Sequence, residues 1–265
     1  MSNHCQPPPV QFQAEPGVAV EKGDASNLSA SKKSCVLFFD VSVCIANWNC
    51  RDLLRGCLES LRDQQGVSVQ VIVVDNASTD RTSLVAARLG AQVIREDVRG
   101  YGRSYKRGFA CATGDLIVTL DGDHSYPVDA LSYLLEAFRH LEVDFLNASR
   151  FPVRDQQAMT LKHHFGNLVL SIAMSLLYFR WVRDSQSGMW VFRRSILKNM
   201  RLTSDGMAFS EEIKIEALKN SRIRFAEISI LYSSRLGEIK LNPWRDGVYN
   251  LLFLVKKRFE RRTPG

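Results

Sequence analysis

Short apolar runs and longer amphipathic stretches alternate along the first half of the chain. β-Branched runs at 41–45, 69–74, 92–95 and 116–120 have the length and composition of buried strands. Between them, the spacing of apolar residues predicts helices over 51–64, through 84–89, and over 101–112. Ser78 or Thr79 is expected to cap the second helix and Gly90 to end it. Strands and helices joined by short connections predict a parallel sheet with helices on both faces.

Polar residues follow three of these strands at the point where each strand ends. They lie at 47–49, 75–80 and 121–123. Parallel sheets bind ligands beyond the carboxyl ends of their strands. We therefore expect these three segments to meet in one crevice.

The two ends of the chain differ from this pattern. Residues 1–35 contain a Pro-Pro-Pro run and no periodicity, which predicts a disordered extension before a domain over 36–241. Residues 242–265 read as a basic amphipathic helix containing Lys256, Lys257 and Arg258. The longest apolar stretch, 165–182, contains Asn167 and Arg180 and falls short of a membrane span, so an integral membrane protein is not expected.

Composition narrows the setting only a little. The chain has 35 basic and 28 acidic residues, a net charge of +7 and a pI of about 9.2. This excess favours nucleic acid, an anionic membrane or a phosphorylated substrate, and its sign does not choose among them. No nucleic-acid motif is recognised, so we expect no nucleic-acid partner. Six cysteines without a Cys-x-x-Cys pair predict a reducing, cytoplasmic compartment.

The Asp121-Gly122-Asp123 turn carries the clearest chemistry. Two carboxylates separated by one small residue can present oxygens to a single hard cation such as Mg²⁺ or Mn²⁺. Such an ion would also bind ligand phosphates and neutralise the charge of a leaving diphosphate. A solvated acidic turn is the alternative, because Asp-Gly is common in turns. The position after the fourth strand favours the metal site.

Other polar segments are less specific on their own. Asp75 is suited to accept a hydrogen bond from a nucleobase, whereas Ser78 or Asp80 would cap the helix that follows. Arg103, in a glycine-interrupted basic segment, is a phosphate contact or part of a solvated face. Farther along lie a Ser-Gly turn at 187–188 and a basic loop with Arg235 and Lys240, which would suit closure over a diphosphate.

Five segments in order, between about 41 and 250, resemble family-two glycosyltransferases of the GT-A fold. The similarity is greatest to the group that transfers mannose or glucose to dolichyl or polyprenyl phosphate. VSVCIANWN is similar to VSVVIPxYN, and VIVVDNASTDRT to VVDDxSxDxT. GYGRSYKRGFACATGDLIVTLDGDHSYP resembles GxGxAxxxGxxxAxGDxIxxxDADxxxPP. DSQSGMWVFRR is similar to DxxSGFRxFRR, and YSSRLGEIKLNPWRDG to YxxRxGxSKLNPxRDG.

The resemblance implies roles for named positions. Asp121 and Asp123 would bind the metal, and the catalytic set would be Asp123, Arg235 and Glu212. The donor would contact Ala46, Asn47, Asn49, Asp75, Arg103, Asp121, Gly122 and Lys240, and the acceptor would contact Asp184, Ser187 and Gly188. The chain departs from the family pattern at Ala46, Cys50, Asn76, Ser125 and Met189-Trp190. Ser125 replaces a residue that sometimes adds a third metal ligand.

The expected reaction is inverting, metal-dependent transfer of a sugar from a nucleotide-sugar to a polyprenyl phosphate. A phosphate acceptor needs no general base, because its second pKa is about 6. A hydroxyl acceptor on a saccharide or protein is the alternative. GDP-mannose and a UDP-sugar both stay open as donors, and so does the oligomeric state. Helical segments at 161–178 and 244–259 would bring the enzyme to the cytosolic face of a membrane as a peripheral protein. Core packing is the alternative for the first segment, and a solvated tail helix is the alternative for the second.

Overall fold

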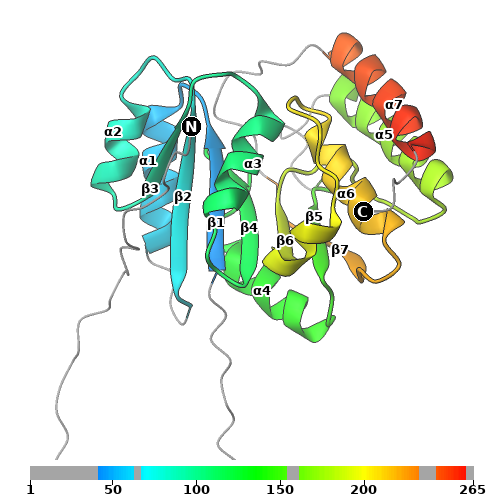
Figure 1. Ribbon diagram of the computed structural model, residues 1–265, viewed down its shortest axis with the longest axis horizontal. Coiled ribbons are helices and arrows are strands. Elements are labelled where there is room, and N and C mark those ends of the chain that lie inside the picture. Colours follow the sequence, from blue (N-terminus) through cyan, green and yellow to red (C-terminus); the bar gives the residue numbers. More distant parts are fainter. Residues whose placement is uncertain (1–40, 63–66, 154–160, 233–242, 261–265) are drawn as a thin grey trace, which may run out of the picture.

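A central sheet organises the computed structural model, which describes residues 41–62, 67–153, 161–232 and 243–260 (Figure 1). Its strands are β1 (Val41–Asn47), β2 (Val69–Asn76), β3 (Gln92–Glu96), β4 (Leu116–Asp121), β5 (Phe145–Ser149), β6 (Trp190–Arg193) and β7 (Phe225–Ser229). The seven strands lie in the order β3-β2-β1-β4-β6-β5-β7. The first four are the predicted strands, and they pair in parallel. β6 runs antiparallel to both β4 and β5, while β7 is parallel to β5.

Helices cover both faces of the sheet, as the alternating pattern predicts. They are α1 (Arg51–Arg62), α2 (Thr82–Arg88), α3 (Tyr101–Cys111), α4 (Ala130–His140), α5 (Leu161–Tyr178), the 3₁₀ helix η1 (Arg194–Asn199), α6 (Phe209–Lys219) and α7 (Pro243–Phe259). Neither Ser78 nor Thr79 caps α2. Instead, the Asp80 carboxylate accepts a hydrogen bond from the Thr82 amide at 3.0 Å, because α2 begins later than the pattern indicates. Gly90, at φ 83°, ends α2 as expected.

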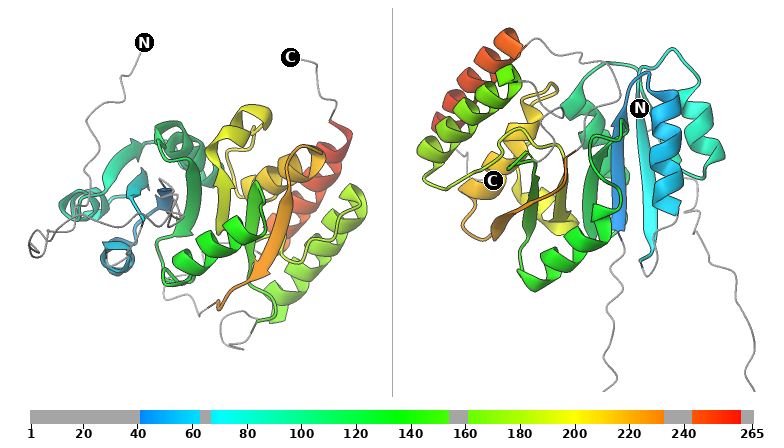
Figure 2. Two further views of the ribbon diagram at one scale, coloured as in Figure 1. Left: turned by 90° about the horizontal axis from the view of Figure 1, so that it is seen from below. Right: turned by 180° about the vertical axis from the view of Figure 1, so that it is seen from behind.

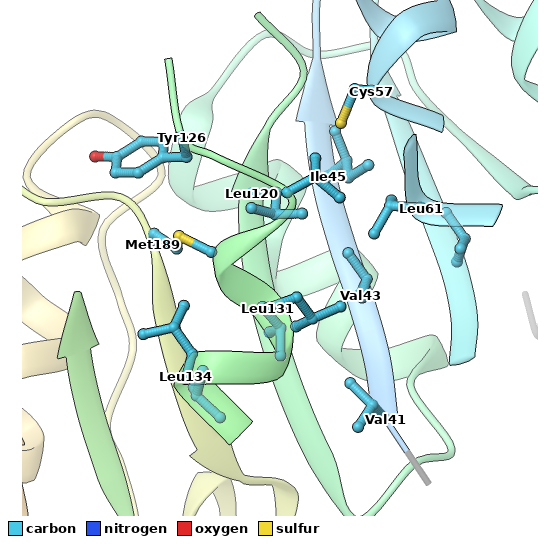
Figure 3. Packing of buried hydrophobic residues seen from close by; sticks show 14 of the residues in the cluster. Val41, Val43, Ile45, Cys57, Leu61, Leu120, Tyr126, Leu131, Leu134 and Met189 are labelled. Carbon is cyan, nitrogen blue, oxygen red and sulfur yellow. The ribbon is translucent and has the colours of Figure 1, made fainter. Parts of the chain in front are cut away.

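Alternating side chains of the strands supply two separate cores. Val43 and Ile45 of β1 point to the face that α1 and α4 cover, where they pack with Leu61 and Leu134 (Figure 3). Cys44, between them, points to the opposite face. There α3 and α6 pack with the aromatic residues Tyr105, Phe109, Trp190, Phe192 and Phe209. The period-two alternation of a strand buried on both faces accounts for this division.

The α5 and α7 helices form an additional layer, packed side by side over α6 (Figure 2). Leu170, Met174 and Tyr178 of α5 meet Leu254 of α7 and Ile215 of α6. The Tyr178 hydroxyl also donates to the Leu254 carbonyl at 3.0 Å. Among the described residues, no helix has the length and hydropathy needed to cross a bilayer.

The α7 helix has an unusual polarity, because its buried stripe is partly polar and its exposed stripe is apolar. Asn250, Leu254 and Lys257, spaced by four and three residues, face inward. The opposite stripe exposes Val248, Leu251, Leu252, Val255 and Phe259. In α5, the same spacing exposes Phe165, Leu168, Val169, Ile172 and Leu176. These ten residues are called the outward stripes below.

Candidate active site

The end of β1 lies between the ends of β2 and β4. The parallel register sets Asn47 beside Asp75 on one side and Ala46 beside Asp121 on the other. The predicted convergence of polar strand ends is therefore confirmed for the segments after β1, β2 and β4. Parallel pairing produces this arrangement, because it brings the carboxyl ends of neighbouring strands to one edge.

The DGD turn packs closely against β1. A Cβ added at Gly122 would lie 2.7 Å from Asn47 Oδ1 and 3.2 Å from Leu54 Cδ1, so a side chain at this position would displace Asn47. On the other face of the sheet, the buried Tyr105 hydroxyl donates to the Leu120 carbonyl at 3.2 Å. The same hydroxyl lies 3.5 Å from Asp121 Oδ1. Gly122 and Tyr105 thus hold the backbone and side chain of Asp121 from opposite sides.

Ser125 orients the second carboxylate of the turn. Its amide and hydroxyl both donate to Asp123 Oδ1, at 3.1 and 2.5 Å, and both residues are buried. His124, which lies between Asp123 and Ser125 in the sequence, has a φ of 61°. Its ring lies over Gly56 of α1, so that a Cβ added at Gly56 would stand 2.6 Å from His124 Nε2. The serine therefore fixes the orientation of Asp123.

The donor set fits a hard cation that is held jointly with a phosphate ligand. The described ranges contain no group of three or more His, Cys, Asp or Glu side chains suited to hold a metal ion. Asp121 and Asp123 offer two carboxylates, and Mg²⁺ is commonly bound by one or two carboxylates together with substrate phosphates. Nearby, the buried Asn47 Nδ2 has no hydrogen-bond partner among the residues that the structure describes. A ligand oxygen would satisfy that amide donor.

Asp75 and Asn49 form hydrogen bonds that order the loops after β2 and β1. Asp75 accepts from the Ser78 amide at 3.0 Å and from the Ser83 hydroxyl. Asn49 Oδ1 accepts from the Thr79 backbone amide at 2.8 Å, and the Asn49 backbone amide donates to Ser78 Oγ at 3.0 Å. Asp75 and Asn49, which are both predicted to contact the nucleotide-sugar, therefore shape the wall of the crevice.

Residues 184–188, which include the predicted Ser187-Gly188 turn and are together called the Ser-Gly turn from here on, border the Asp121-Gly122-Asp123 turn. Gly188 donates to the Tyr126 hydroxyl at 2.7 Å and accepts from Thr119 Oγ1 at 2.7 Å. A Cβ at 188 would lie 2.9 Å from Tyr101 Oη and 3.5 Å from Asp121 Oδ2. Ser187 is buried, and its hydroxyl donates to the Ala148 carbonyl at 2.5 Å. Among the three predicted acceptor residues, Gly188 thus lies next to the predicted metal ligands.

Asp184, at the start of this turn, is engaged in a buried ion pair. Arg150 Nε and Nη2 donate to its two oxygens, both at 2.8 Å, and Asn167 Nδ2 adds a bond at 3.2 Å. Burial by itself would raise the pKa of Asp184, but the Arg150 guanidinium outweighs it and holds that pKa at about 2. Asp184 is therefore an anion that fixes the turn to Arg150.

Arg103 and the glycines around it pack against the loop before α6. A Cβ at Gly102 would lie 2.4 Å from the Ser204 carbonyl. Arg103 Nη2 and Lys106 Nζ both donate to Asp205, at 2.8 and 2.6 Å. These glycines permit close backbone contact with the loop, and the basic segment pairs with its aspartate.

Glu212 is buried away from solvent at the centre of another cluster. It accepts from the Thr203 and Ser204 amides, at 2.9 and 2.8 Å, and from Lys257 Nζ at 2.8 Å. Glu212 thereby joins the loop before α6 to α7. Lys257 also pairs with Glu216 and Glu260, so this lysine belongs to the interior, unlike the exposed Lys256.

Several residues at the site were not predicted. Tyr101 and Tyr126 bring their hydroxyls to Gly188, and Arg150 holds Asp184. Tyr126 lies at the edge of the core with its hydroxyl pointing away from it (Figure 3). The sequence feature that could have identified Tyr126 as a site residue is its position three residues after Asp123. Arg150 follows a strand that the pattern left unassigned. Arg235 and Lys240 lie outside the described residues, so their roles stay predictions.

Comparisons with known proteins agree with this geometry. The sequence profile described as Glycosyl transferase family 2 matches residues 42–201. A low-salt glycan biosynthesis hexosyltransferase of Haloferax volcanii is 34% identical over 222 residues, which are 81% of this chain and 53% of that protein. A dolichyl-phosphate hexose transferase of the same organism is 27% identical over 225 residues, 85% of this chain and 96% of the relative. The chain thus spans about half the length of the first relative and nearly all of the second.

A third relative and two solved structures extend the comparison. The dolichol-phosphate mannosyltransferase of Pyrococcus furiosus is 26% identical over 211 residues, covering 76% of this chain and 59% of that protein. Glucosyl-3-phosphoglycerate synthase of Mycobacterium tuberculosis, in complex with Mn²⁺, UDP and glucosyl-3-phosphoglycerate, has a TM-score of 0.65 at 18% identity, covering 83% and 80% of the two chains. Mannosyl-3-phosphoglycerate synthase of Rubrobacter xylanophilus has a TM-score of 0.66 at 21% identity, covering 83% and 73%. The predicted GT-A fold is confirmed.

Proposed function

The chain belongs to glycosyl transferase family 2, and on that premise we propose that it transfers a sugar from a nucleotide-sugar to a polyprenyl phosphate at a membrane surface. One observation carries the proposal. The two helices with apolar outward stripes pack directly on the turn that borders Asp121. From α5, Ser171 Oγ accepts from the Ser185 amide at 3.0 Å, and from α7, Asn250 Nδ2 donates to Gln186 at 3.2 Å. Such an arrangement suits an acceptor whose phosphate is small and whose tail is lipid.

The donor half of the site follows from the ends of β1, β2 and β4. Asp121 and Asp123 would hold Mg²⁺ or Mn²⁺, which neutralises negative charge on the leaving nucleoside diphosphate. Asp75 would face the base of the nucleotide-sugar. Asn47 Nδ2, which has no hydrogen-bond partner among the described residues, would donate to an oxygen of the nucleotide-sugar. Arg235 and Lys240 are expected near the phosphates. These assignments leave GDP-mannose and UDP-sugars as the donors to be compared.

The acceptor half requires positioning rather than proton abstraction. A phosphate monoester is largely dianionic at neutral pH, so it can attack the anomeric carbon directly with inversion. The chain's contribution is then to hold the acceptor in line with the departing diphosphate. Gly188 allows this turn to approach Asp121 closely, and the ion pair of Asp184 with Arg150 keeps the turn in place.

Membrane contact is proposed through the outward stripes of α5 and α7. Helices at a lipid interface combine large apolar side chains with nearby basic residues. Phe179 and Trp181, which follow α5, are 82% and 76% exposed and extend the apolar surface. Lys162 and Arg180, near the ends of α5, and Lys256 on α7 are exposed cations beside it. An anionic, cytosolic membrane face matches this charge.

Transfer to a hydroxyl is the second candidate. Both solved neighbours are named as synthases of phosphoglycerate glycosides, which supports a small or soluble acceptor. A hydroxyl acceptor would need a general base as well as positioning.

A labelled-donor assay separates the candidates. Labelled GDP-mannose, UDP-glucose and a UDP-N-acetylhexosamine are each supplied with Mn²⁺ or Mg²⁺ and liposomes, with and without polyprenyl phosphate. We expect label in the organic phase only when polyprenyl phosphate is present. Label confined to water-soluble product supports the hydroxyl acceptor. Wild-type protein that transfers nothing from any donor would overturn both.

Matched variants connect that activity to the site. Asp121→Asn and Asp123→Asn remove one charge each with little change in shape, and both should abolish metal-dependent transfer. Asp97→Asn is the control, because Asp97 pairs only with exposed Arg95 on the surface, at 2.8 Å.

A further inference from the structure

Lys214 is a fully buried lysine to which the proposed chemistry gives no part. It lies on α6, and its ammonium donates to the carbonyls of Ser185 and Ser187, each at 2.7 Å. Two further bonds reach the Ser210 carbonyl at 3.0 Å and the Ser210 hydroxyl at 3.1 Å. A buried ammonium is costly unless it is well hydrogen-bonded, and here backbone oxygens meet that requirement.

The carbonyls that Lys214 binds belong to the Ser-Gly turn. The carbonyl of Ser187 accepts three hydrogen bonds, from Lys214 Nζ at 2.7 Å, from Trp190 Nε1 at 2.8 Å and from Ser210 Oγ at 2.9 Å. The next residue, Gly188, bonds to Thr119, which lies two positions before Asp121 on β4. Lys214 is thus connected to Asp121 through the turn and through one strand.

We propose that Lys214 is a positioning residue for the transfer reaction, and that its ammonium holds the Ser-Gly turn so that Gly188 stays closely packed against Asp121. The inference rests on the proposed function. Lys214 touches neither predicted metal ligand, so it acts through the turn. Without its ammonium, the Ser185 carbonyl would lose a 2.7 Å bond and the turn could shift toward Asp121. Displacements of about 1 Å cost a catalysed reaction on the order of a hundredfold.

The charge state of Lys214 gives the proposal a second readout. Burial lowers its pKa to about 7, while Asp184, Glu211 and Glu227 oppose that effect and Arg150 adds to it. Glu211, three residues earlier on α6, has a pKa raised by burial to about 8, and its Oε2 has no hydrogen-bond partner. Turnover should therefore fall as the pH rises through the pKa of Lys214.

The first test compares Lys214→Met with Lys257→Met. Both lysines are buried and bonded to α6, but Lys257 bonds carboxylates and the Arg201 carbonyl on a different side of it. For Lys214→Met we expect kcat to fall on the order of tenfold or more, with KM for the donor changed less than about threefold. Lys257→Met should lower the melting temperature, and it serves as the control for the loss of stability that follows removal of a buried lysine. Wild-type kcat in folded Lys214→Met would overturn the proposal.

The second test uses pH and keeps the lysine in place. Glu211→Gln removes the other buried group on α6 that titrates near this pH, so an alkaline loss of kcat that belongs to Lys214 should persist in the variant. If Glu211→Gln abolishes that loss instead, the titrating group is Glu211 and the proposal is overturned. This variant covers the case in which Lys214→Met does not fold. Wild-type protein without any transfer would overturn the proposed function together with this inference, whereas active wild type with an unaffected Lys214→Met variant overturns the inference alone.

Discussion

Gly188 stands directly against Asp121, so that a Cβ at position 188 would lie 3.5 Å from the Asp121 carboxylate oxygen Oδ2. The two residues come from segments far apart in the sequence. Thr119 and Tyr126 hydrogen-bond the backbone of Gly188 and hold it there. The Ser-Gly turn is therefore a wall of the predicted metal site, and its lack of a side chain is part of the geometry.

Gly188→Ala should reduce transfer far more than it reduces stability. The new methyl would also lie 2.9 Å from Tyr101 Oη, so either the tyrosine or the turn must shift beside Asp121. We expect kcat/KM to fall on the order of tenfold or more. Steady-state kinetics and a melting curve measure the two effects. Gly166→Ala on α5 is the control, because a Cβ there meets nothing within 4 Å. Equal kinetics for the two variants would contradict the role of Gly188.

Ser125→Ala should weaken metal binding without removing a metal ligand. The hydroxyl that is lost donates to Asp123 Oδ1 at 2.5 Å and restricts rotation of that carboxylate. Residues that orient metal ligands contribute about tenfold or more to affinity. Calorimetric titration of Mn²⁺ with UDP or GDP measures the change. Ser60→Ala is matched to it, since the Ser60 hydroxyl bonds only the Gly56 carbonyl within α1. Unchanged affinity in Ser125→Ala would show that the serine does not orient Asp123.

Asp184→Asn should destabilise the fold, and the loss should depend on pH. Removing one partner of a buried ion pair costs about 3–5 kcal/mol. Arg150 keeps the pKa of Asp184 at about 2, below its ordinary value of 3.8. The stabilisation by the carboxylate is therefore complete above about pH 5 and is lost as the pH falls toward 2.

Urea unfolding of both proteins between pH 2 and 7 tests this prediction. The difference in unfolding free energy should be constant above pH 5 and shrink by about 2 kcal/mol toward pH 2. A difference that does not vary with pH would mean that folding does not lower the pKa of Asp184.

Leu252→Glu should release the protein from liposomes and leave nucleotide binding intact. Leu252 is 64% exposed in the outward stripe of α7, so a charge there disturbs lipid contact without affecting the core. We expect the fraction that floats with anionic liposomes to fall on the order of tenfold. Tyr133→Glu on α4, at a residue that is 54% exposed, is the control. Deleting 242–265 is a less specific test, because it also removes Lys257 from Glu212. Equal flotation of Leu252→Glu and wild type would contradict membrane contact through α7.

Local pattern was sufficient for the first half of the fold. The β-branched runs and amphipathic spacings matched β1 to β4 and α1 to α3, because those elements follow one another along the chain and pair with near neighbours. The antiparallel β6 was not predicted. Its position between β4 and β5 depends on pairing across distant sequence, which propensity and periodicity do not encode.

The same limit applies to the site. Asp75, Asn47 and Asp121 were placed together correctly because strand ends determine their position. The partners of Arg103 and Glu212 come from a loop and a helix remote in sequence, so local motifs gave no sign of them. Lys257 was read as part of an exposed basic cluster, but it is buried because Glu212 and Glu216 lie opposite it.

The inverted polarity of α7 has a consequence for how the protein behaves in a test tube. Lys257 of α7 forms ion pairs with α6 and Asn250 donates a hydrogen bond to Gln186, while the large apolar side chains of the opposite stripe stay in contact with water. An amphiphile that prefers these exposed side chains of the folded chain raises the melting temperature, and one that prefers the apolar side chains exposed by unfolding lowers it. Detergent and lipid content are therefore variables that every unfolding experiment on this chain has to hold fixed.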